Sequence, residues 1–410
     1  MNKRLTVGLF MDSYFPMIDG VTMVMDNYAK RLGKYGDVIV FVPDISNGKF
    51  DDSKLGYKVV RCKSIKMPIL DYSLPMPHVD RKFMKEIEKY KLDIVHIHSP
   101  FTMGRVGIEY ARKHKIPVVG TMHSQFKQDF KRAVKSDHVA KELTKVPIHE
   151  FNKCDECWAV NKEVARIFYE DYHCKEMPRV MNNSTEMLPL PDPKAADERI
   201  NKLHGISEDE KVLLFVGRIN KLKNIFFIID SLKVINEKYP DFKYKMLFVG
   251  SGQDEEELKE MIHKNHMEDK VIMVGKVTDR ELLASYYKRA NLFLFPSLYD
   301  ASSIVQIEAA SQKTPTMFLK GAATASTVTD RVNGYLSEND PEIYARDIVN
   351  IFKDEKAYNE LCENAYRDLY KNWDDTVKEV YERYEYLYEK KQKEIKENEE
   401  KKLKRKNLEK

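Results

Sequence analysis

The sequence predicts an α/β protein with two doubly wound, Rossmann-like domains and a long C-terminal helix. The 410 residues suffice for two domains, each with its own core. Short β-branched apolar runs alternate with helical patterns in both halves of the chain, which is typical of parallel strands buried on both faces. The segment Glu186–Lys194 separates the two series, because its three prolines cannot continue a helix or a central strand.

The first domain is predicted at residues 1–185. Its apolar runs have the length of strands, and the segments between them repeat apolar residues at helical spacing. The predicted strands are Leu5–Phe10, Val38–Val42, Tyr57–Arg61, Ile94–Ile97, Val118–Thr121 and Trp158–Val160. The predicted helices are Val21–Leu32, Arg81–Tyr90, Arg105–Lys113 and Glu163–Tyr169.

A linker is predicted at residues 186–197 and a second domain at 198–373. The alternation of strands and helices resumes there, so a second parallel sheet is expected. The predicted strands are Val212–Val216, Lys245–Val249, Val271–Val274, Leu292–Phe295 and Thr316–Leu319. The predicted helices are Ile225–Asn236, Glu255–His263, Asp279–Arg289, Ile304–Gln312 and Pro341–Lys353.

Residues 374–410 are predicted to form one helix, because Tyr381, Tyr384, Leu387 and Tyr388 follow helical spacing. Its last part, 389–410, carries ten Lys and Arg against six Glu, which equals the whole net charge of +4. This tail is either a solvated helix or an electrostatic anchor for anionic lipid.

Composition excludes several classes of protein. The chain has 42% hydrophobic and 33% charged residues, as a soluble globular protein does. Without its tail it is close to neutral, which argues against a nucleic-acid binder. No apolar run approaches the roughly 18 residues of a membrane span, and the N-terminal apolar stretch is too short for a signal peptide. We expect a cytoplasmic protein.

The five cysteines fit a reducing compartment. The motif Cys154-x-x-Cys157, with His149, His173 and Cys174 nearby in the sequence, is compatible with a metal or redox site. No second Cys-x-x-Cys is present, however, so we favour two cysteines at the entrance to a buried strand.

A pair of carboxylates is the most informative local pattern. Asp300 and Glu308 are separated by seven residues and follow the predicted strand Leu292–Phe295. An acid at a loop tip and another inside the next helix can reach two hydroxyls of one ligand. The amides between them begin a helix, and such amides attract phosphate. This combination suits a nucleotide-sugar.

Two cations lie at the end of another strand of the second domain. Arg218 and Lys223 are five positions apart and can clamp a diphosphate, with Lys221 as an exposed rival of Lys223. The segment Val249-Gly250-Ser-Gly252 repeats the strand-then-glycine pattern and is a candidate wall of the nucleotide pocket. The chain has no Asp-x-Asp motif to hold Mg²⁺ on the diphosphate. Cations and amides would therefore stabilise the phosphates without a metal.

The first domain offers its own strand-end motifs. Gly20 lies in a turn between the first strand and a helix, where it permits close backbone approach. His123 follows the strand Val118–Thr121, while His98 and His96 belong to the neighbouring strand. An isolated histidine at such a place is more often a structural residue than a catalytic one.

Together these motifs make the chain resemble the family-4 retaining glycosyltransferases of the GT-B fold, in which two Rossmann-like domains face each other across a cleft. The resemblance rests on Phe15-Pro-x-x-x-Gly20, Val95-His-Ile-His98, the strand end at His123, Gly217-Arg218 through Lys223, and the acid pair. It implies that residues 1–185 bind the acceptor and 198–373 the nucleotide-sugar, while 374–410 return toward the first domain.

The resemblance also implies roles for the residues of the second domain. Glu308 would hold the ribose and Asp300 the hydroxyls of the transferred sugar. Ser303 and Ile304 would offer backbone amides to the phosphate, and the basic pair would stabilise the leaving diphosphate.

In the first domain, the resemblance implies that His123 orients the sugar. In the usual proposal for the family, a phosphate oxygen of the donor deprotonates the acceptor, so the reaction needs no protein nucleophile.

The chain departs from the family pattern at Asp300, where Glu is usual, and at Ala301 and Ser303, where Gly is frequent. The segment Asn182-Asn183-Ser184 also replaces a usual Asn-Gly. The shorter Asp300 would contact a donor hydroxyl from farther away, which could change the sugar preference or weaken the activity. A non-catalytic partner subunit is therefore one alternative.

The acceptor is suggested by the segment Ser124–Lys135. Its helical pattern places Phe126, Phe130 and Val134 on one stripe, beside Lys127, Lys131, Arg132 and Lys135. Such a helix either packs on its own domain or lies on an anionic lipid surface.

The family most similar in this region, the bacterial diacylglycerol glucosyltransferases, implies a lipid acceptor at the inner face of the cell membrane. It also implies UDP-glucose as the default donor and no tightly bound cofactor. A polyprenyl-linked, capsular or cell-wall saccharide remains an alternative acceptor, and a sugar-nucleotide epimerase an alternative activity.

Overall fold

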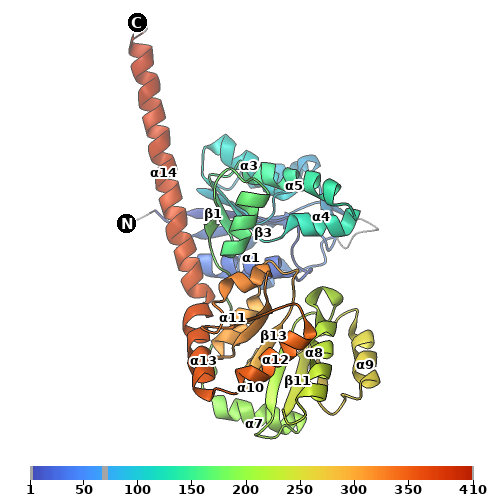
Figure 1. Cartoon of the computed structure of the whole chain (residues 1–410). Coiled ribbons are helices and arrows are strands. Elements are labelled where there is room, and N and C mark those ends of the chain that lie inside the picture. The colour runs from blue at the N-terminus through green and yellow to red at the C-terminus, as the bar shows by residue number, and fades with distance from the viewer. Residues whose placement is uncertain (1–2, 67–72, 409–410) are drawn as a thin grey trace. The chain divides into compact units, whose positions relative to one another are not determined.

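The structure is a computed structural model that describes residues 3–66 and 73–408. The chain divides into two compact units (Figure 1). Unit 1 consists of Met1–Asn183 together with Trp373–Lys410, and unit 2 consists of Ser184–Asn372.

The described residues of unit 1 form a seven-stranded sheet in the order β3-β2-β1-β6-β7-β8-β9, in which all neighbours are parallel. The strands β4 and β5, which follow β3 in the sequence, form a separate short antiparallel pair. The strands are β1 (Thr6–Phe10), β2 (Asp37–Pro43), β3 (Lys58–Cys62), β4 (Ser64–Lys66), β5 (Ser73–Pro75), β6 (Ile94–Ile97), β7 (Val118–Met122), β8 (Glu156–Ala159) and β9 (Arg179–Val180).

Helices of unit 1 connect these strands. The helices are α1 (Gly20–Leu32), α2 (Arg81–Ile87), α3 (Thr102–His114), α4 (Phe126–Val134), α5 (Asp137–Phe151) and α6 (Lys162–Arg166), with the short turns η1 (Asp52–Leu55), η2 (Pro77–Val79) and η3 (Ile167–Asp171). The predicted helix Glu163–Tyr169 is split between α6 and the π-helical turn η3. Helix α5 was not predicted from the sequence; it contains Pro147, which is buried within the helix.

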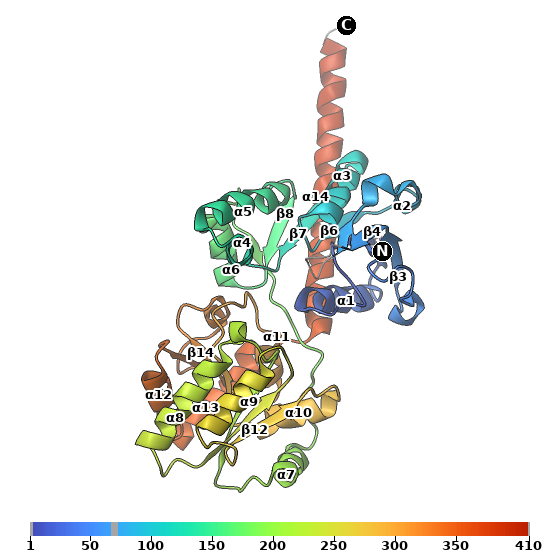
Figure 2. The same cartoon turned by 90° about the vertical axis from the view of Figure 1, so that its right-hand side faces the viewer.

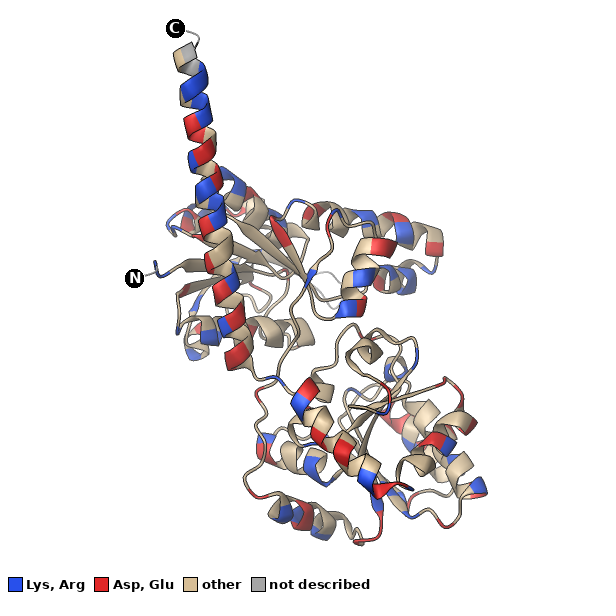
Figure 3. Cartoon of the chain, turned by 60° about the vertical axis from the view of Figure 1, so that its left-hand side comes forward, with Lys and Arg blue, Asp and Glu red and all other residues tan. Residues whose placement is uncertain are grey.

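Helix α14 (Trp373–Leu408) packs on unit 1 through its first half. The Tyr381 hydroxyl accepts a hydrogen bond from the Leu5 amide at 3.0 Å. Tyr384 stacks on Trp158 with ring centroids 5.6 Å apart. Farther along, the helix extends beyond the rest of unit 1 (Figure 2), with acidic and basic residues interspersed along it (Figure 3). The predicted long helix is confirmed, and its exposed end is helical to Leu408.

The described part of unit 2 holds a six-stranded parallel sheet in the order β12-β11-β10-β13-β14-β15. Fully buried strand residues such as Leu214, Phe248 and Phe293 form its core together with buried apolar residues of the helices, such as Ile228 and Leu232. The strands are β10 (Lys211–Val216), β11 (Tyr244–Val249), β12 (Val271–Gly275), β13 (Leu292–Phe295), β14 (Thr316–Leu319) and β15 (Tyr335–Ser337).

The helices of unit 2 include two that were not predicted, α7 and α13. Helix α7 begins at Pro193, with Asp192 as its N-cap, so the last part of the predicted linker 186–197 is helical. The helices are α7 (Pro193–His204), α8 (Ile225–Lys238), α9 (Glu255–Lys264), α10 (Arg280–Arg289), α11 (Ile304–Ser311), α12 (Pro341–Ile351) and α13 (Glu355–Leu369), with η4 (Lys221–Lys223) and η5 (Ala323–Thr327).

Both sheets confirm the predicted doubly wound architecture, and each has a point where the strand order reverses. In unit 1 this point lies between β1 and β6, and in unit 2 it lies between β10 and β13. Loops at the carboxyl ends of such strands are the usual ligand sites of open α/β sheets. The loops after β1 and β6 hold Asp12 and His98, and the loops after β10 and β13 hold Arg218 and Asp300.

Candidate active site

At the switch point of unit 2, Lys223 and Asp300 contact each other. The Lys223 ammonium lies 2.5 Å from Asp300 Oδ1, with side-chain exposures of 21% and 16%. Lys223 is placed by η4, whose preceding residue Asn220 accepts a hydrogen bond from the Lys223 amide. The next residue, Asn224, adopts a left-handed conformation and donates to the Pro296 carbonyl at 3.3 Å. The loops after β10 and β13 are thereby joined around an ion pair.

The other two cations of this loop lie differently. Lys221 turns toward α9 and pairs with Glu257 at 2.7 Å, with both side chains more than half exposed. Arg218 is exposed after Gly217. Of the two rival lysines, only Lys223 contacts the acid of the predicted site.

Glu308 is 5% exposed and is held by two residues of α10. Arg280 donates from Nη2 to Glu308 Oε1 at 2.7 Å, and Tyr287 donates from its hydroxyl to Oε2 at 3.0 Å. Neither residue was selected from the sequence. A signal was present, however, because a cation at the first position of a helix opposes the helix dipole and calls for an anionic partner.

Helix α11 begins within the acid pair. Ser303 is its N-cap, and the Ser303 hydroxyl accepts a hydrogen bond from the Gln306 amide at 3.2 Å. The amides of Ser303 and Ile304 belong to the part of the helix start that has no intrahelical carbonyl partner. A helix thus begins where the sequence predicted it, and the contact of these amides with phosphate stays a prediction.

The glycines of the loop after β11 allow close packing of loops. A Cβ at Gly250 would lie 1.9 Å from the Gly217 carbonyl oxygen, and one at Gly252 would lie 2.1 Å from that of Ile219. The Gly250 amide donates to the Gly275 carbonyl at 2.8 Å. Packing between these loops explains both glycines, so their predicted contact with the nucleotide stays a prediction.

In unit 1, three histidines gather at the ends of β6 and β7. His98 Nδ1 lies 3.1 Å from His123 Nε2, and the rings of His96 and His98 have centroids 4.1 Å apart. His96 is fully buried, and its two nitrogens lie 2.6 Å from the hydroxyls of Tyr384 and Thr121. His96 is therefore a structural residue, whereas His98 and His123 form a pair at the strand ends.

Burial keeps these imidazoles neutral. It lowers the pKa of His123 to about 3, and it lowers the pKa values of His96 and His98 well below 6.5. His98 Nε2 is buried without a hydrogen-bond partner among the described residues. An unpaired lone pair there costs less than an unpaired N–H, which favours His98 Nδ1–H donating to His123 Nε2.

The loop after β1 is built around Asp12. Its carboxylate accepts hydrogen bonds from the Ser99 hydroxyl at 2.5 Å and the Met103 amide at 2.8 Å. Farther along, Asp19 caps α1 by accepting from the Thr22 amide at 2.7 Å. A Cβ at Gly20 would meet nothing within 4 Å, so packing inside the chain does not explain why this residue is glycine.

The predicted amphipathic helix is α4, and part of its apolar stripe packs inside unit 1. Phe126 is 7% exposed and contacts Phe101, Phe151 and Phe168, whereas Val134 is 39% exposed. Packing on unit 1 thus accounts for the start of the stripe but not for its end.

The basic residues of α4 lie close to the start of α5. Lys127 and Lys131 both pair with Asp137, at 3.4 and 3.2 Å, while Arg132 and Lys135 are exposed. A further apolar stripe lies on α5, where Val139, Leu143 and Val146 are 43%, 37% and 45% exposed. This stripe was not predicted from the sequence, because α5 was not predicted.

The cysteine motif of unit 1 has a structural explanation. Cys157 donates to the Phe151 carbonyl and Cys174 to Asn152 Oδ1, both at 3.3 Å. The His, Cys, Asp and Glu side chains of residues 3–66 and 73–408 form no group of three suited to a metal ion. Over the same residues, no helix combines the length and apolar composition that crossing a bilayer requires.

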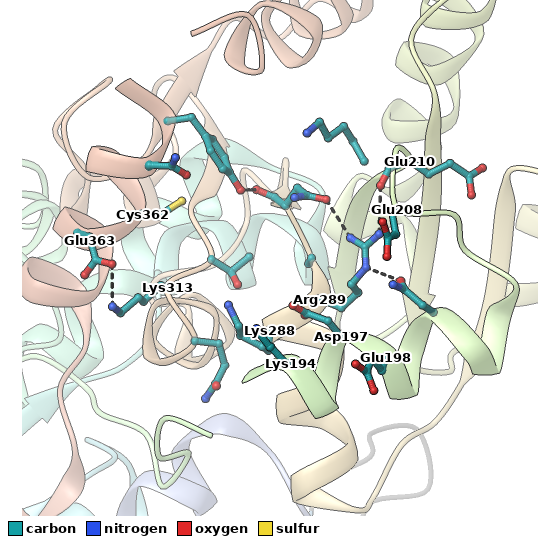
Figure 4. Close-up of a pocket in the computed structure, with 18 of the residues that line it drawn as sticks. Lys194, Asp197, Glu198, Glu208, Glu210, Lys288, Arg289, Lys313, Cys362 and Glu363 are labelled. Atoms are coloured by element: carbon teal, nitrogen blue, oxygen red, sulfur yellow. Dashed lines mark hydrogen bonds and ion pairs between the residues drawn. The ribbon is translucent and has the colours of Figure 1, made fainter. Parts of the chain in front are cut away.

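A separate pocket of about 760 Å³ opens in unit 2 at the amino ends of β10 and β13, whereas the site described above lies at their carboxyl ends (Figure 4). Arg289 inside it is already held by Asn201, Asn291 and the Glu210 carbonyl. The charged lining consists of Lys194, Lys211, Lys288, Arg289 and Lys313 with Asp197, Glu198, Glu208, Glu210, Glu360 and Glu363. Because these acids outnumber the cations, this pocket does not provide the positive potential that a diphosphate requires.

Comparison with known families accounts for both units. The family model "Glycosyltransferase Family 4" matches residues 18–184, and the model "Glycosyl transferases group 1" matches residues 196–368. Together they cover most of the chain.

Similar proteins of known name include two alpha-monoglucosyldiacylglycerol synthases. The one from Streptococcus pneumoniae is 27% identical over 346 residues, which are 82% of this chain and 76% of that protein. The one from Acholeplasma laidlawii is 24% identical over 372 residues, which are 88% of this chain and 92% of that protein.

Solved structures show the same fold. Anabaena Alr3699/HepE in complex with UDP has a TM-score of 0.73 at 15% identity, covering 93% of this chain and 99% of that chain. Sucrose-phosphate synthase from Thermosynechococcus elongatus has a TM-score of 0.74 at 19% identity, covering 94% and 99%. With its two parallel-sheet units and its matches to both family models, the chain belongs to the family-4 glycosyltransferases of the GT-B fold and resembles the diacylglycerol glucosyltransferases among them.

Proposed function

We propose that this chain transfers a hexose from a UDP-sugar, with retention of configuration, to a lipid or lipid-linked acceptor at a membrane face. The observation that carries the proposal is the set of charged groups at the switch point of unit 2. There a lysine, an acid and a helix start meet, and a second acid lies one helical turn further on. UDP-glucose is the default donor because two similar proteins are named alpha-monoglucosyldiacylglycerol synthases.

Each part of a UDP-sugar has a suitable partner in unit 2. Glu308 would accept hydrogen bonds from the ribose, and the amides of Ser303 and Ile304 would face the phosphate. Arg218 and Lys223 would stabilise the negative charge that develops on the leaving diphosphate. The phosphates would need no metal for this.

Asp300 has two tasks in this proposal. It holds Lys223 in place at 2.5 Å and would bind a hydroxyl of the transferred sugar. A lysine has three donors, so Lys223 can contact both the carboxylate and a phosphate oxygen. The non-catalytic alternative is less favoured, because a site without turnover needs no such placement of Lys223.

In unit 1, His123 would orient the sugar as a neutral hydrogen-bonding group. The acceptor hydroxyl would then lose its proton to a phosphate oxygen of the donor, and the protein would contribute by holding both reactants close. Gly20 supports a ligand contact at the start of α1, since the space beside it is open.

The membrane contact is proposed for the α4–α5 hairpin. Its cations, Lys127, Lys131, Arg132 and Lys135, lie on α4 or at its C-cap, and α5 carries the exposed apolar stripe. Cations that attract anionic headgroups and apolar side chains that enter the headgroup region are the two components of interfacial binding.

One assay tests the proposal. The protein is incubated with UDP-glucose, UDP-galactose or UDP-N-acetylglucosamine, with and without vesicles containing diacylglycerol, and UDP release is measured. We expect one donor to give release that depends on the acceptor. Interconversion of the sugars would support an epimerase instead, and UDP binding without turnover would support a non-catalytic subunit.

A further inference from the structure

Helix α10 holds the carboxylate of Glu308 at two points. Arg280 and Tyr287 are seven residues apart, which places them two turns apart on one face of the helix. Arg280 contacts Oε1 at 2.7 Å and Tyr287 contacts Oε2 at 3.0 Å. Each residue thus binds a different oxygen of the same carboxylate, which fixes both its position and its rotation.

Stability alone is a poor explanation for this arrangement. Tyr287 is fully buried and Glu308 is 5% exposed, so a hydroxyl and a carboxylate have been removed from water between α10 and α11. Such buried polar groups usually contribute less to stability than well-packed apolar side chains of the same size. A carboxylate kept at this place, with two dedicated partners, therefore indicates a ligand.

The number of hydrogen bonds supports the same conclusion. An ionised carboxylate offers about four lone-pair positions, and α10 uses one on each oxygen. The remaining positions, one on each oxygen, suit two neighbouring hydroxyl donors. The ribose of a UDP-sugar carries such a pair, its 2′- and 3′-hydroxyls.

The geometry points to Arg280 and Tyr287 as positioning residues that aim Glu308 at the two ribose hydroxyls, so that α10 sets the preference for ribonucleotides over deoxyribonucleotides. This inference rests on the proposed role of Glu308 at the ribose. It adds two residues that act through Glu308 rather than on the reacting atoms.

The inference is tested by comparing two ligands, with and without the ribose 2′-hydroxyl, on the wild type and on variants of α10. Affinities of the full chain for UDP and for 2′-deoxy-UDP are measured by calorimetry for the wild type, Arg280→Gln and Tyr287→Phe. We expect each variant to bind UDP about tenfold more weakly, since hydrogen bonds to a charged group are lost. Binding of 2′-deoxy-UDP should weaken clearly less, so the preference for the ribose form shrinks.

Arg199→Gln is the matched control, because Arg199 is a half-exposed arginine whose partner Glu281 also lies on α10, at 3.9 Å. It should leave both affinities unchanged. The Arg280 side chain is 54% exposed, so its replacement should keep the fold, which an unchanged melting temperature verifies. Arg280→Lys keeps the charge and should restore part of the ribose preference.

Two outcomes would overturn the inference: equal losses for both ligands, or no loss for either. The proposed role of Glu308 has a separate test in Glu308→Gln. If that variant keeps the wild-type preference for UDP, the ribose assignment itself is wrong. If Glu308→Gln loses the preference while both α10 variants keep it, only the positioning role is wrong.

Discussion

The two sheets of this chain present different chemistry at the same structural position, the carboxyl ends of the strands at a switch point. Unit 2 gathers ionised groups there, with Lys223 paired to Asp300 and Arg280 paired to Glu308. Unit 1 gathers neutral imidazoles, His98 and His123, whose nitrogens lie 3.1 Å apart. One architecture thus supports a cluster of ion pairs in one unit and a pair of buried imidazoles in the other.

Burial and pairing explain the difference. A buried imidazole without an anionic partner stays neutral because desolvation disfavours its charged form. At the unit 2 site, by contrast, Lys223 lies at hydrogen-bond distance from Asp300, and Arg280 lies at hydrogen-bond distance from Glu308. This difference supports our proposal that unit 2 would provide electrostatic stabilisation and unit 1 would orient the sugar by hydrogen bonds.

Large losses of turnover are expected at the unit 2 site, beginning with Lys223. Lys223→Ala should lower kcat about 10²–10³-fold, which is typical for the loss of one group that stabilises charge in the transition state. Steady-state UDP release with a saturating acceptor measures this. Lys221→Ala is the matched control, since Lys221 pairs on the surface with Glu257, and it should change kcat little. Similar losses in both variants would contradict the role given to Lys223.

The two acids, Asp300 and Glu308, should have different functions. Asp300→Ala is expected to preserve UDP affinity within a few-fold and to abolish measurable turnover, because the sugar loses its partner and Lys223 loses its anchor. Glu308→Ala should instead weaken UDP binding by at least tenfold. Calorimetry with UDP and turnover with a UDP-sugar measure the two effects. Equal loss of UDP affinity in both variants would show that the two acids act as one unit.

The fold was largely predictable because apolar strands buried on both faces give an unambiguous pattern. The elements that were missed lack such a pattern. Helix α5 contains Pro147, which usually ends a helix, and α13 buries mainly Leu361 and Ala365. Tertiary packing stabilises both helices where their own sequences give a weak signal.

The sequence did not predict contacts between residues of different helices and loops. The positions of Asp300 and Lys223 follow from motifs, but their contact depends on how the loops after β10 and β13 fold together. The holding of Glu308 by α10 is likewise a contact between two helices. A local clue existed only for Arg280, a cation placed against the helix dipole.

The pH dependence of stability should also differ between the units, because unit 1 holds the histidines whose pKa values are lowered furthest by burial. The pKa values of His96 and His98 are lowered by burial, so below pH 6.5 the unfolded chain binds protons that the folded chain does not. Stability should therefore fall as the pH drops from about 6.5 toward 4, by up to about 1.4 kcal/mol per pH unit for each imidazole.

Urea unfolding at several pH values measures this slope, with probes in each unit. His78→Gln is the control, because His78 is exposed and its removal should leave the slope unchanged. His98→Gln should reduce the slope even if it also lowers the overall stability. An unaltered slope in His98→Gln would mean that this imidazole binds protons equally in both states.

The smallest effect is expected at the membrane surface, where unit 1 should respond to charge changes and unit 2 should not. Reversing Lys127, Lys131 and Lys135 to Glu should weaken co-sedimentation with anionic vesicles, although two of these lysines are already paired with Asp137. Leu143→Gln removes part of the apolar stripe and should weaken binding about fivefold, which corresponds to about 1 kcal/mol.

The matched control for these variants is the reversal of Lys238, Lys243 and Lys320, three half-exposed lysines of unit 2 that are also paired with acids. It alters the net charge by the same amount, so general electrostatic attraction predicts equal losses in both triple variants. A specific α4–α5 surface predicts a loss only in the unit 1 variant. The Leu143 variant then separates insertion from attraction, because its effect should persist at high salt, where the contribution of the lysines is screened.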